Sequence, residues 1–294
     1  MTKDYGGEWT EDKLSRLRKY LKAYMTIFAA NKKAKYLTPI YVDAFAGSGY
    51  RLQAQKQPEG SFLFPEIMKP DAEGFLKGSA RIALEITPSF KQFIYVEQDP
   101  LKVRDLENLR IEFPQKSKNI TIVETEANAF LKKWCAETNW RNIRAVVFLD
   151  PYGMEVEWSI IQSLADTQAV DLWLLFPLGM AVNRLLRKNS PPNLGWERAL
   201  NRFFGTDDWK DAFYSWTKEV TLFGEEEVLV KDTDFDGIAR YFVNRLKKVF
   251  PGVAENPLPL RNSKNIPLYL LCFAVANPRA VKPALRIAQH ILGR

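Results

Sequence analysis

Four acidic residues stand where a carboxylate could bind a ligand, because each follows a short apolar run that predicts a β-strand. They are Asp43, Glu97, Glu126 and Asp150. The first is followed by Ala46-Gly47-Ser48-Gly49, residues with almost no side chain. Such residues permit a sharp turn and let a ligand approach the backbone closely. Since ligands bind at the carboxyl ends of strands in open α/β sheets, these residues predict a site for a cationic or hydroxyl-bearing ligand.

Three nucleotide-binding loops compete for the glycine-rich turn. The phosphate loop of NTPases needs Gly-Lys-Ser/Thr, and no Gly-Lys occurs in the chain. The dinucleotide fingerprint needs a third glycine where Leu52 stands. The segment from Asp43 to Gly49 resembles the first motif of class I S-adenosylmethionine (SAM) methyltransferases, in its amino-methyltransferase version. An ordinary glycine-rich turn stays open as the alternative, because Gly-x-Gly alone is weakly specific.

The order of the acids along the chain supports the cofactor interpretation. An acid after the second strand can accept both ribose hydroxyls of SAM, and Glu97 stands there. An acid after the third strand can accept the adenine amine, and Glu126 fits that place. Each acid alone would more often be a solvated loop carboxylate. The residues expected to bind SAM are Asp43, Phe45, Ala46, Gly47, Gly49, Glu97, Glu126 and Asp150.

The segment after the fourth strand, Leu149-Asp150-Pro151-Tyr152-Gly153, resembles the Asp-Pro-Pro-Tyr motif of methyltransferases that act on amines of nucleic-acid bases. An exocyclic amine has its lone pair delocalised into the ring, so it needs acceptors for its hydrogens as it attacks the methyl group. The resemblance implies that Asp150 and the Pro151 carbonyl are those acceptors and that Tyr152 stacks on a base taken out of its stack.

This segment also departs from the motif, since its second proline is missing and Gly153 follows the tyrosine. Asp-Pro-Tyr/Phe-Gly occurs in some relatives of tRNA guanine-N2 methyltransferases, so the target base and the polymer stay open. Methyl transfer to cytosine C5 is disfavoured, because it needs a Pro-Cys nucleophile where Pro151-Tyr152 stands.

Several segments resemble the bacterial three-Cys-motif partner protein family. They are Lys3–Thr10, Tyr41–Arg51, Phe148–Trp158, Asp171–Gly179 and Phe204–Trp209, and the resemblance extends from about residue 3 to the C-terminus. It implies a class I methyltransferase-like fold and association with a separate three-cysteine protein that resembles radical-SAM enzymes. This chain has no three-cysteine motif of its own.

Apolar strands alternate with helices up to about residue 178, which predicts an α/β fold with a mostly parallel, Rossmann-like sheet covered on both faces. Strands are expected over residues 40–43, 93–96, 120–123, 145–149, 170–176 and 268–274. The alternation stops over residues 179–265, where helical patterns include residues 208–216. We therefore expect a SAM-binding domain of residues 1–178 and 266–294 with an inserted helical subdomain of residues 179–265.

Bulk properties narrow the functional classes. The 294 residues carry a net charge of +7, which is compatible with a nucleic-acid partner but is also common in enzymes. Cys135 and Cys272 predict buried free thiols in a reducing compartment, and with a single histidine no metal site is expected. The N-terminal residues are too polar for a signal peptide and the apolar runs too short to span a bilayer, so a cytoplasmic protein is expected.

The sequence thus predicts a SAM-dependent methyltransferase for an exocyclic amine, with nucleic acid as the expected substrate. Two alternatives stay open: a non-catalytic or regulatory partner protein that keeps the fold, and a methyltransferase for a small molecule or protein. The polar stretch of residues 51–77 leaves the glycine turn, where a lid or substrate loop is expected. The aromatic residues Trp196, Trp209, Phe213 and Trp216 predict either a small core of the insertion or a docking surface.

Overall fold

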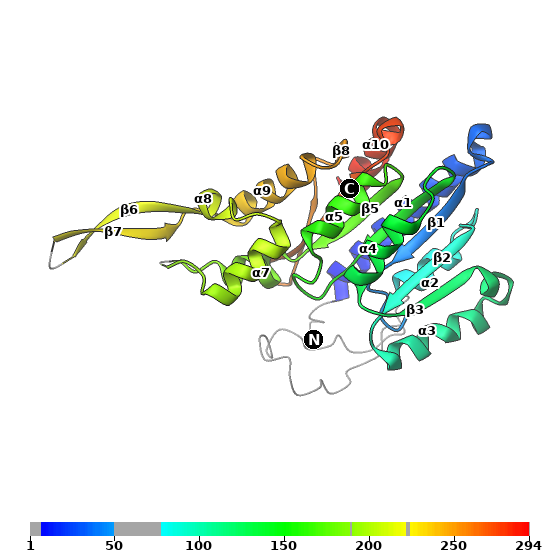
Figure 1. The fold of residues 1–294 in the computed structure, drawn as a ribbon, viewed down its shortest axis with the longest axis horizontal. Coiled ribbons are helices and arrows are strands. Elements are labelled where there is room, and N and C mark those ends of the chain that lie inside the picture. Colours follow the sequence, from blue (N-terminus) through cyan, green and yellow to red (C-terminus); the bar gives the residue numbers. More distant parts are fainter. Residues whose placement is uncertain (1–6, 50–77, 189, 222–223, 294) are drawn as a thin grey trace.

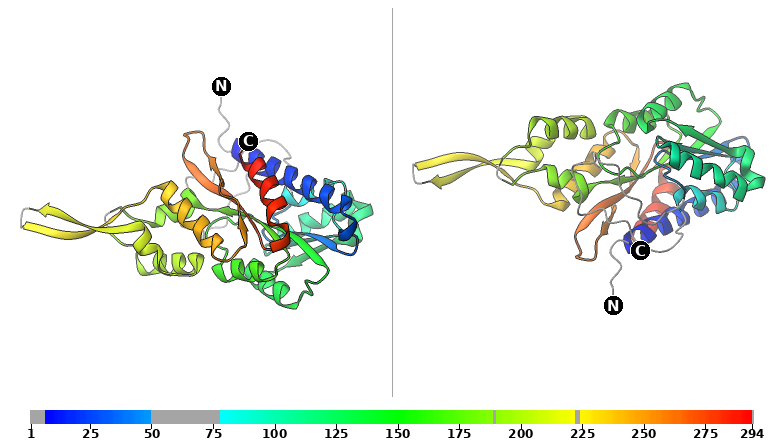
Figure 2. Two further views of the ribbon diagram at one scale, coloured as in Figure 1. Left: turned by 90° about the horizontal axis from the view of Figure 1, so that it is seen from above. Right: turned by 90° about the horizontal axis from the view of Figure 1, so that it is seen from below.

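The computed structural model describes residues 7–49, 78–188, 190–221 and 224–293. A central sheet has the order β3-β2-β1-β4-β5-β10-β8, with β9 paired to β10, and helices cover both of its faces (Figures 1 and 2). The strands β1 to β5 are parallel, and β10 runs antiparallel to β5. This is the expected α/β fold with a mostly parallel, Rossmann-like sheet.

The strands of this sheet are β1 (Thr38–Asp43), β2 (Gln92–Glu97), β3 (Ile120–Glu124), β4 (Ile143–Leu149), β5 (Val170–Phe176), β8 (Gly252–Val253), β9 (Leu258–Arg261) and β10 (Pro267–Val275). The α-helices are α1 (Gly7–Ala30), α2 (Ser79–Glu85), α3 (Pro100–Glu112), α4 (Ala127–Glu137), α5 (Trp158–Asp166), α6 (Asn183–Leu185), α7 (Leu194–Phe204), α8 (Trp209–Phe213), α9 (Phe235–Lys247) and α10 (Val281–Leu292). Each strand expected from the sequence is present, within a few residues of its predicted ends.

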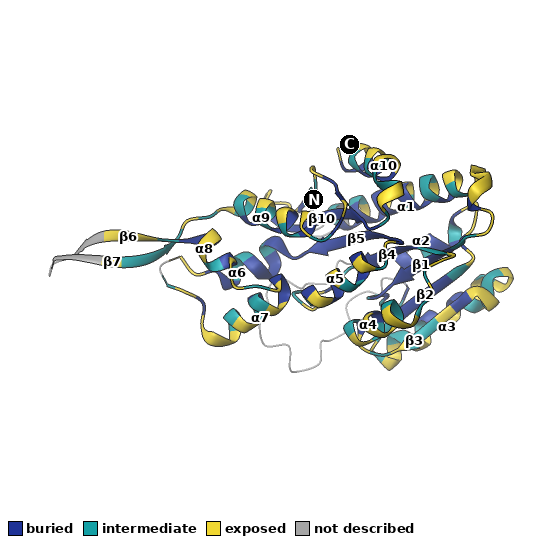
Figure 3. Cartoon of the chain, turned by 45° about the horizontal axis from the view of Figure 1, so that its top comes forward, coloured by how far each residue is buried: buried dark blue, intermediate teal, exposed yellow. Residues whose placement is uncertain are grey.

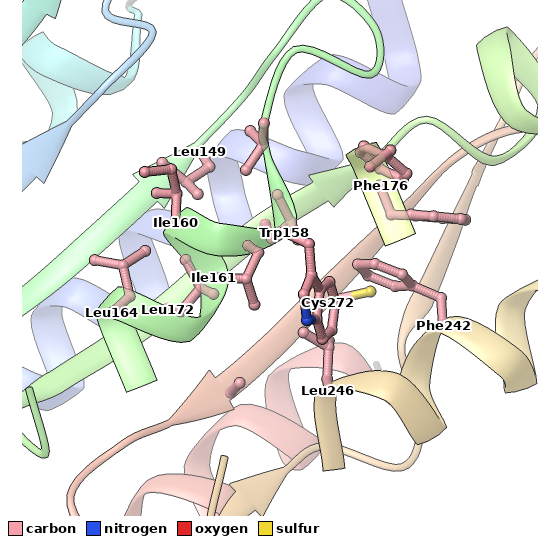
Figure 4. Close-up of a cluster of buried hydrophobic side chains, with 14 of the residues drawn as sticks. Leu149, Trp158, Ile160, Ile161, Leu164, Leu172, Phe176, Phe242, Leu246 and Cys272 are labelled. Atoms are coloured by element: carbon pink, nitrogen blue, oxygen red, sulfur yellow. The ribbon is translucent and has the colours of Figure 1, made fainter. Parts of the chain in front are cut away.

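Two hydrophobic clusters lie on the two faces of the sheet. The strands therefore bury side chains on both faces, which explains why their sequences are continuous apolar runs rather than alternating ones. One cluster joins the sheet to α4, α5, α7, α8 and α9. Figure 4 shows part of it, where Trp158 and Phe242 lie beside Cys272 of β10. The other cluster joins the sheet to α1, α2, α3 and α10. In Figure 3 the strands β1, β2, β4, β5 and β10 are almost entirely buried, while the helices are exposed on their outer sides.

The segment 179–265 differs from the purely helical insertion that the sequence predicted. It contains α6 to α9, but also a hairpin of β6 (Tyr214–Thr221) and β7 (Gly224–Lys231) that projects from the body (Figure 1). It also contributes β8 and β9 to the main sheet. The helix expected over residues 208–216 ends at Phe213, because Tyr214 already pairs with Lys231 in the hairpin. The division of the chain into two domains stays a prediction.

The four aromatic residues of this segment divide into different environments. Trp209 and Phe213 are buried in the first hydrophobic cluster, as the core interpretation predicts. Trp196 is half-buried, with the Arg187 guanidinium over its ring. Trp216 lies on β6 and is 69% exposed. The pattern therefore combines a core with one exposed side chain on the hairpin.

Both cysteines are free thiols, but they are not equally buried. Cys272 is buried in β10, whereas Cys135 on α4 is half-buried. Burial raises the pKa of Cys135 to about 12 and that of Cys272 further, so both are thiols at neutral pH. The part of the chain that the structure describes contains no helix long and apolar enough to cross a bilayer.

Candidate functional site

Two of the predicted acids lie side by side at one edge of the sheet. β1 and β4 are neighbouring parallel strands, so Asp43 at the end of β1 is placed next to Asp150, which follows the end of β4. In the sheet, β2 and β3 lie on one side of β1, and β4 and β5 lie on the other side. Ligands of open α/β sheets bind at such a switch point, outside the carboxyl ends of the strands.

The glycine turn after β1 has the backbone geometry that its sequence predicted. Gly47 and Gly49 have φ values of +61° and +71°, a region that residues with a side chain rarely adopt. A Cβ on Gly47 would meet no atom of the described residues within 4 Å. The Ala46 amide donates to the Val96 carbonyl at 3.1 Å, which fixes the turn to β2.

The stretch 50–77 lies outside the described residues, but its two flanking residues lie in contact. The Gly78 amide donates to the Gly49 carbonyl at 3.2 Å. A Cβ on Gly78 would lie 2.7 Å from that carbonyl oxygen, so only glycine fits without movement. Directly after it, Ser79 begins α2 and its hydroxyl donates to Asp43 at 2.5 Å.

Asp43 is completely buried and accepts several hydrogen bonds. Besides Ser79, the Phe45 amide donates to its other oxygen at 3.3 Å and the Tyr41 hydroxyl lies 3.5 Å away. Burial raises the pKa of Asp43 to about 7, and the nearby carboxylate of Asp150 adds to this. The hydroxyl of Ser79 and the charge of Lys13 act in the opposite direction. Asp43 is therefore poised to change its charge near neutral pH.

Glu97 ties the glycine turn to the end of β2. One of its oxygens accepts from the Gly47 amide at 3.0 Å, and the other accepts from the amides of Gln98 and Asp99 at 2.9 and 3.0 Å. A carboxylate has about four acceptor positions, so this leaves limited capacity for ribose hydroxyls. A ribose at Glu97 would share the carboxylate with these amides or displace one of them.

Glu126 has a structural role in this arrangement. Its two oxygens accept from the amides of Asn128 and Ala129, both at 2.8 Å, which makes it the N-cap of α4. The residue is exposed, and the Asn128 side chain also donates to it. The proposed contact with adenine stays a prediction.

Lys13 of α1 forms an ion pair with Asp150 that the sequence analysis did not foresee. Its Nζ lies 2.5 Å from Asp150 Oδ2, with the lysine side chain 5% exposed and the aspartate side chain 25% exposed. The same ammonium group lies 5.3 Å from the centre of the Trp9 ring. The site is thus a cluster of one buried cation and two carboxylates, Asp43 and Asp150.

Aromatic residues from distant parts of the chain flank Asp150. Trp9 stacks on Tyr269 of β10, with ring centroids 5.2 Å apart. Burial raises the pKa of Tyr269, and the charges of Asp150 and Glu155 add to this rise. Tyr152 is 65% exposed and lies under the Lys102 ammonium of α3, at 5.4 Å from the ring centre. An aromatic platform is therefore open to solvent next to the partly buried carboxylate.

The turn that contains Pro151 and Tyr152 is held by two polar side chains. The Tyr152 amide donates to the Glu155 carboxylate at 3.1 Å. Asn128 donates to the Glu155 carbonyl at 2.8 Å and accepts from the Glu157 amide at 3.0 Å. Asn128 thereby connects the start of α4 to the turn after β4. The sequence analysis missed this role, although Asn128 lies two residues after the acid it singled out.

The residues of this edge suit a ligand such as SAM in charge and in space. The described residues leave space over Gly47, and the carboxylates of Asp43 and Glu97 lie beside it. This arrangement matches a ligand that carries positive charge and hydroxyl groups. Within the described ranges, no cluster of three or more acidic, histidine or cysteine side chains could hold a metal ion. A separate cavity of about 660 Å³ lies between α9 and the β9–β10 pair, and none of the predicted site residues line it.

Comparisons with known proteins find only distant similarity, and only among solved structures. No family model matches the chain, and no curated protein matches it. A protein from Legionella pneumophila is 12% identical over 96% of this chain and 90% of its own, with a TM-score of 0.48. A putative SAM-dependent methyltransferase from Listeria monocytogenes is 10% identical over 88% of this chain and 98% of its own, with a TM-score of 0.38.

A putative methyltransferase from Escherichia coli is also similar, with 14% identity over 74% of this chain and 87% of its own and a TM-score of 0.31. Two of these similar structures are thus described as putative methyltransferases. Such similarity concerns only the arrangement of the chain, and the fold assignment rests on the strand order and directions given above. Membership of the three-Cys-motif partner family stays an interpretation of the sequence.

Proposed function

We propose that this protein is a SAM-dependent methyltransferase that acts on an exocyclic amine of a nucleic-acid base, together with a separate three-cysteine protein. The observation that carries the proposal is the position of Asp150-Pro151-Tyr152 directly beside the Asp43–Gly49 turn, on neighbouring strands. A cofactor on the turn and an amine at Asp150 would then meet at one edge of the sheet.

The chain's own residues supply binding and hydrogen-bond acceptance. SAM, when bound, supplies an electrophilic methyl group. Asp43 and Glu97, with the backbone of the glycine turn, bind and orient it. The Asp150 carboxylate and the Pro151 carbonyl accept the hydrogens of the amine, which lets its nitrogen become tetrahedral. Tyr152, which is exposed beside them, stacks on the base.

Lys13 adds a feature to this mechanism. Its ammonium group occupies one oxygen of Asp150 and fixes the orientation of that carboxylate in the absence of substrate. An incoming amine would use the other oxygen, for which the described residues provide no donor. Lys13 is therefore a positioning residue, which orients the acceptor before the amine arrives.

The test is transfer of labelled methyl from SAM to mixed RNA and DNA, with and without the three-cysteine partner. We expect Asp150→Asn to abolish transfer while SAM affinity changes by less than about threefold, because Asp150 acts on the amine in the transition state. Glu137→Gln is a matched control, since it removes an exposed carboxylate at the end of α4 opposite to Asn128. Transfer that survives Asp150→Asn would contradict the assignment of this residue.

A non-catalytic partner protein is the second candidate function. One observation favours it: both oxygens of Glu126 already accept from backbone amides, as the N-cap of α4. The two candidates are separated by isothermal titration with SAM and S-adenosylhomocysteine. Cofactor binding without methyl transfer under any condition, with the partner present, would favour the non-catalytic role.

A further inference from the structure

The positive charge of this protein is strongly segregated along the chain. Residues 13–42 and residues 256–294 contain no aspartate or glutamate, but hold 14 of the 42 lysines and arginines. The remaining residues then carry 28 basic side chains against all 35 acidic ones. The net charge of +7 therefore comes from these two stretches, while the rest of the chain is net negative.

The fold brings the helices of these two stretches together. α1 and α10 pack against each other on one face of the sheet (Figure 2), and the Arg16 guanidinium donates to the Ile291 carbonyl between them. A groove of about 450 Å³ lies between the helices, lined by Lys19, Lys22, Ala23, Thr26, Ile27 and Ile287. Two segments more than 200 residues apart thus form one cationic face.

Five exposed cations lie on this pair of helices or directly beside it. Lys19 and Lys22 lie on α1, and Lys282 and Arg286 lie on α10, with Arg279 just before it. Nothing in the described part of the chain forms an ion pair with any of these five side chains. By contrast, the less exposed Arg16 and Arg18 pair with Asp12 and Glu85. The outer cations are therefore available to a partner.

The chemistry of the face favours nucleic acid over a protein or a membrane. Protein interfaces are depleted of lysine and enriched in aromatic side chains, and this face has no exposed aromatic residue among the described residues of either helix. A helix that enters a membrane surface presents large apolar side chains outward. Here the apolar sides of α1 and α10 are buried against the sheet, and Ile27 is the one large hydrophobic side chain that is exposed on the described residues of either helix.

We propose that the face formed by Lys19, Lys22, Arg279, Lys282 and Arg286 on α1 and α10 binds the phosphate backbone of a nucleic acid. Phosphate contacts position a protein on nucleic acid without reading its sequence. This proposal depends on the proposed function only in taking a nucleic acid as the partner, because binding to this face requires neither SAM nor Asp150.

The cationic face begins close to the candidate site. Lys13, which contacts Asp150, lies on the same helix as Lys19. Six positions separate the two lysines, which corresponds to about 9 Å along the helix axis. A polymer held by its phosphates on this face could therefore extend to the edge of the sheet where Asp150 and Tyr152 lie.

The test is binding of a fluorescein-labelled RNA hairpin and of a duplex DNA, measured by fluorescence anisotropy over a range of salt concentrations without SAM. We expect the charge-reversal variant Lys19→Glu/Lys22→Glu/Arg286→Glu to lose at least about tenfold in affinity for the bound polymer. The slope of log K against log salt should become shallower by about 2–3, since each phosphate contact contributes about 0.7–0.9 to it. The neutral variant Lys19→Gln/Lys22→Gln/Arg286→Gln should show the same slope change with a smaller loss.

The matched control is Lys118→Glu/Lys132→Glu/Lys248→Glu, which changes the net charge equally at three exposed lysines on other elements. An equal loss in the control would overturn the proposal, since it would assign binding to net charge alone. Absence of binding to both polymers would overturn it too, as would tighter binding to vesicles of phosphatidylserine and phosphatidylcholine than to either polymer. Methyl transfer that persists in a variant with weakened binding would leave the proposed chemistry intact.

Discussion

Asp43 is a buried carboxylate at the centre of the candidate site, and replacing it with asparagine should change how stability depends on pH. Its pKa is raised from 3.8 to about 7 in the folded protein. The folded state therefore holds a proton that the unfolded chain releases, and the free energy of unfolding falls as pH rises from about 4 to about 7. A shift of about three units corresponds to about 4 kcal/mol lost above neutral pH, at 1.36 kcal/mol per unit.

Asp43→Asn removes this dependence and retains an acceptor for the Ser79 hydroxyl. We expect the stability of the variant relative to the native protein to rise by about 2–3 kcal/mol between roughly pH 5 and pH 8. Chemical denaturation of both proteins at a series of pH values measures this difference in the free energy of unfolding. If the free energies of unfolding of the two proteins changed in parallel with pH across this range, the argument would be refuted, because Asp43 would then titrate near its ordinary value.

Asp171 supplies a matched control for the link between this carboxylate and the ligand. It is buried in β5, accepts a hydrogen bond from the Tyr20 hydroxyl, and has its pKa raised by burial to about 7. Asp171→Asn should therefore change the pH dependence of stability in the same sense. Only Asp43→Asn should also weaken SAM binding, since Asp171 lies outside the candidate site. Equal loss of SAM affinity in both variants would indicate that a change in the stability of the fold, and not the loss of a ligand contact, weakens SAM binding.

Three further positions test other parts of the site, and an exposed lysine on α4 serves as a control. Lys13→Met should destabilise the fold by about 1–3 kcal/mol in thermal or chemical denaturation, less than a fully buried pair because Asp150 is partly exposed. Lys133→Met, which breaks an exposed pair, should change stability by less than about 0.5 kcal/mol. Tyr152→Ala should weaken substrate binding by about 1–3 kcal/mol while SAM titration is unchanged, and Tyr152→Phe should have little effect if stacking dominates. Gly78→Ala should cost about 1–3 kcal/mol and weaken SAM binding, because its Cβ would lie 2.7 Å from a backbone oxygen.

Much of the sheet could be predicted from sequence, because buried parallel strands give continuous apolar runs that local patterns reveal. The convergence of Asp43 and Asp150 follows from that pattern, since both lie at the ends of strands that prove to be neighbours. The hairpin β6–β7 was missed, because Tyr214 and Trp216 continue a helical pattern locally and only pairing with β7 makes them a strand. Local propensity cannot reveal a partner strand of that kind.

The assignment of Glu126 shows another limit of sequence reasoning. An acid directly before a helix can cap that helix or bind a ligand, and both roles give the same sequence pattern. The structure shows the cap, through hydrogen bonds to the amides of Asn128 and Ala129, while the contact with adenine stays a prediction. The distinction depends on the direction of the side chain, which periodicity does not contain.

Helix α1 is the element whose role sequence reasoning underestimated most. Lys13 and Asp150 are 137 positions apart, so only the tertiary path of α1 across the sheet brings them together. The same helix sends Tyr20 inward to Asp171 and presents Lys19 outward. Because one helix carries the lysine that pairs with Asp150 near one end and exposed cations further along, a polymer bound as we propose would be held at a fixed distance from Asp150. Substitutions of the outer cations should therefore change the affinity for the polymer. They should leave unaltered the loss of stability that Lys13→Met causes, since these side chains share no partners.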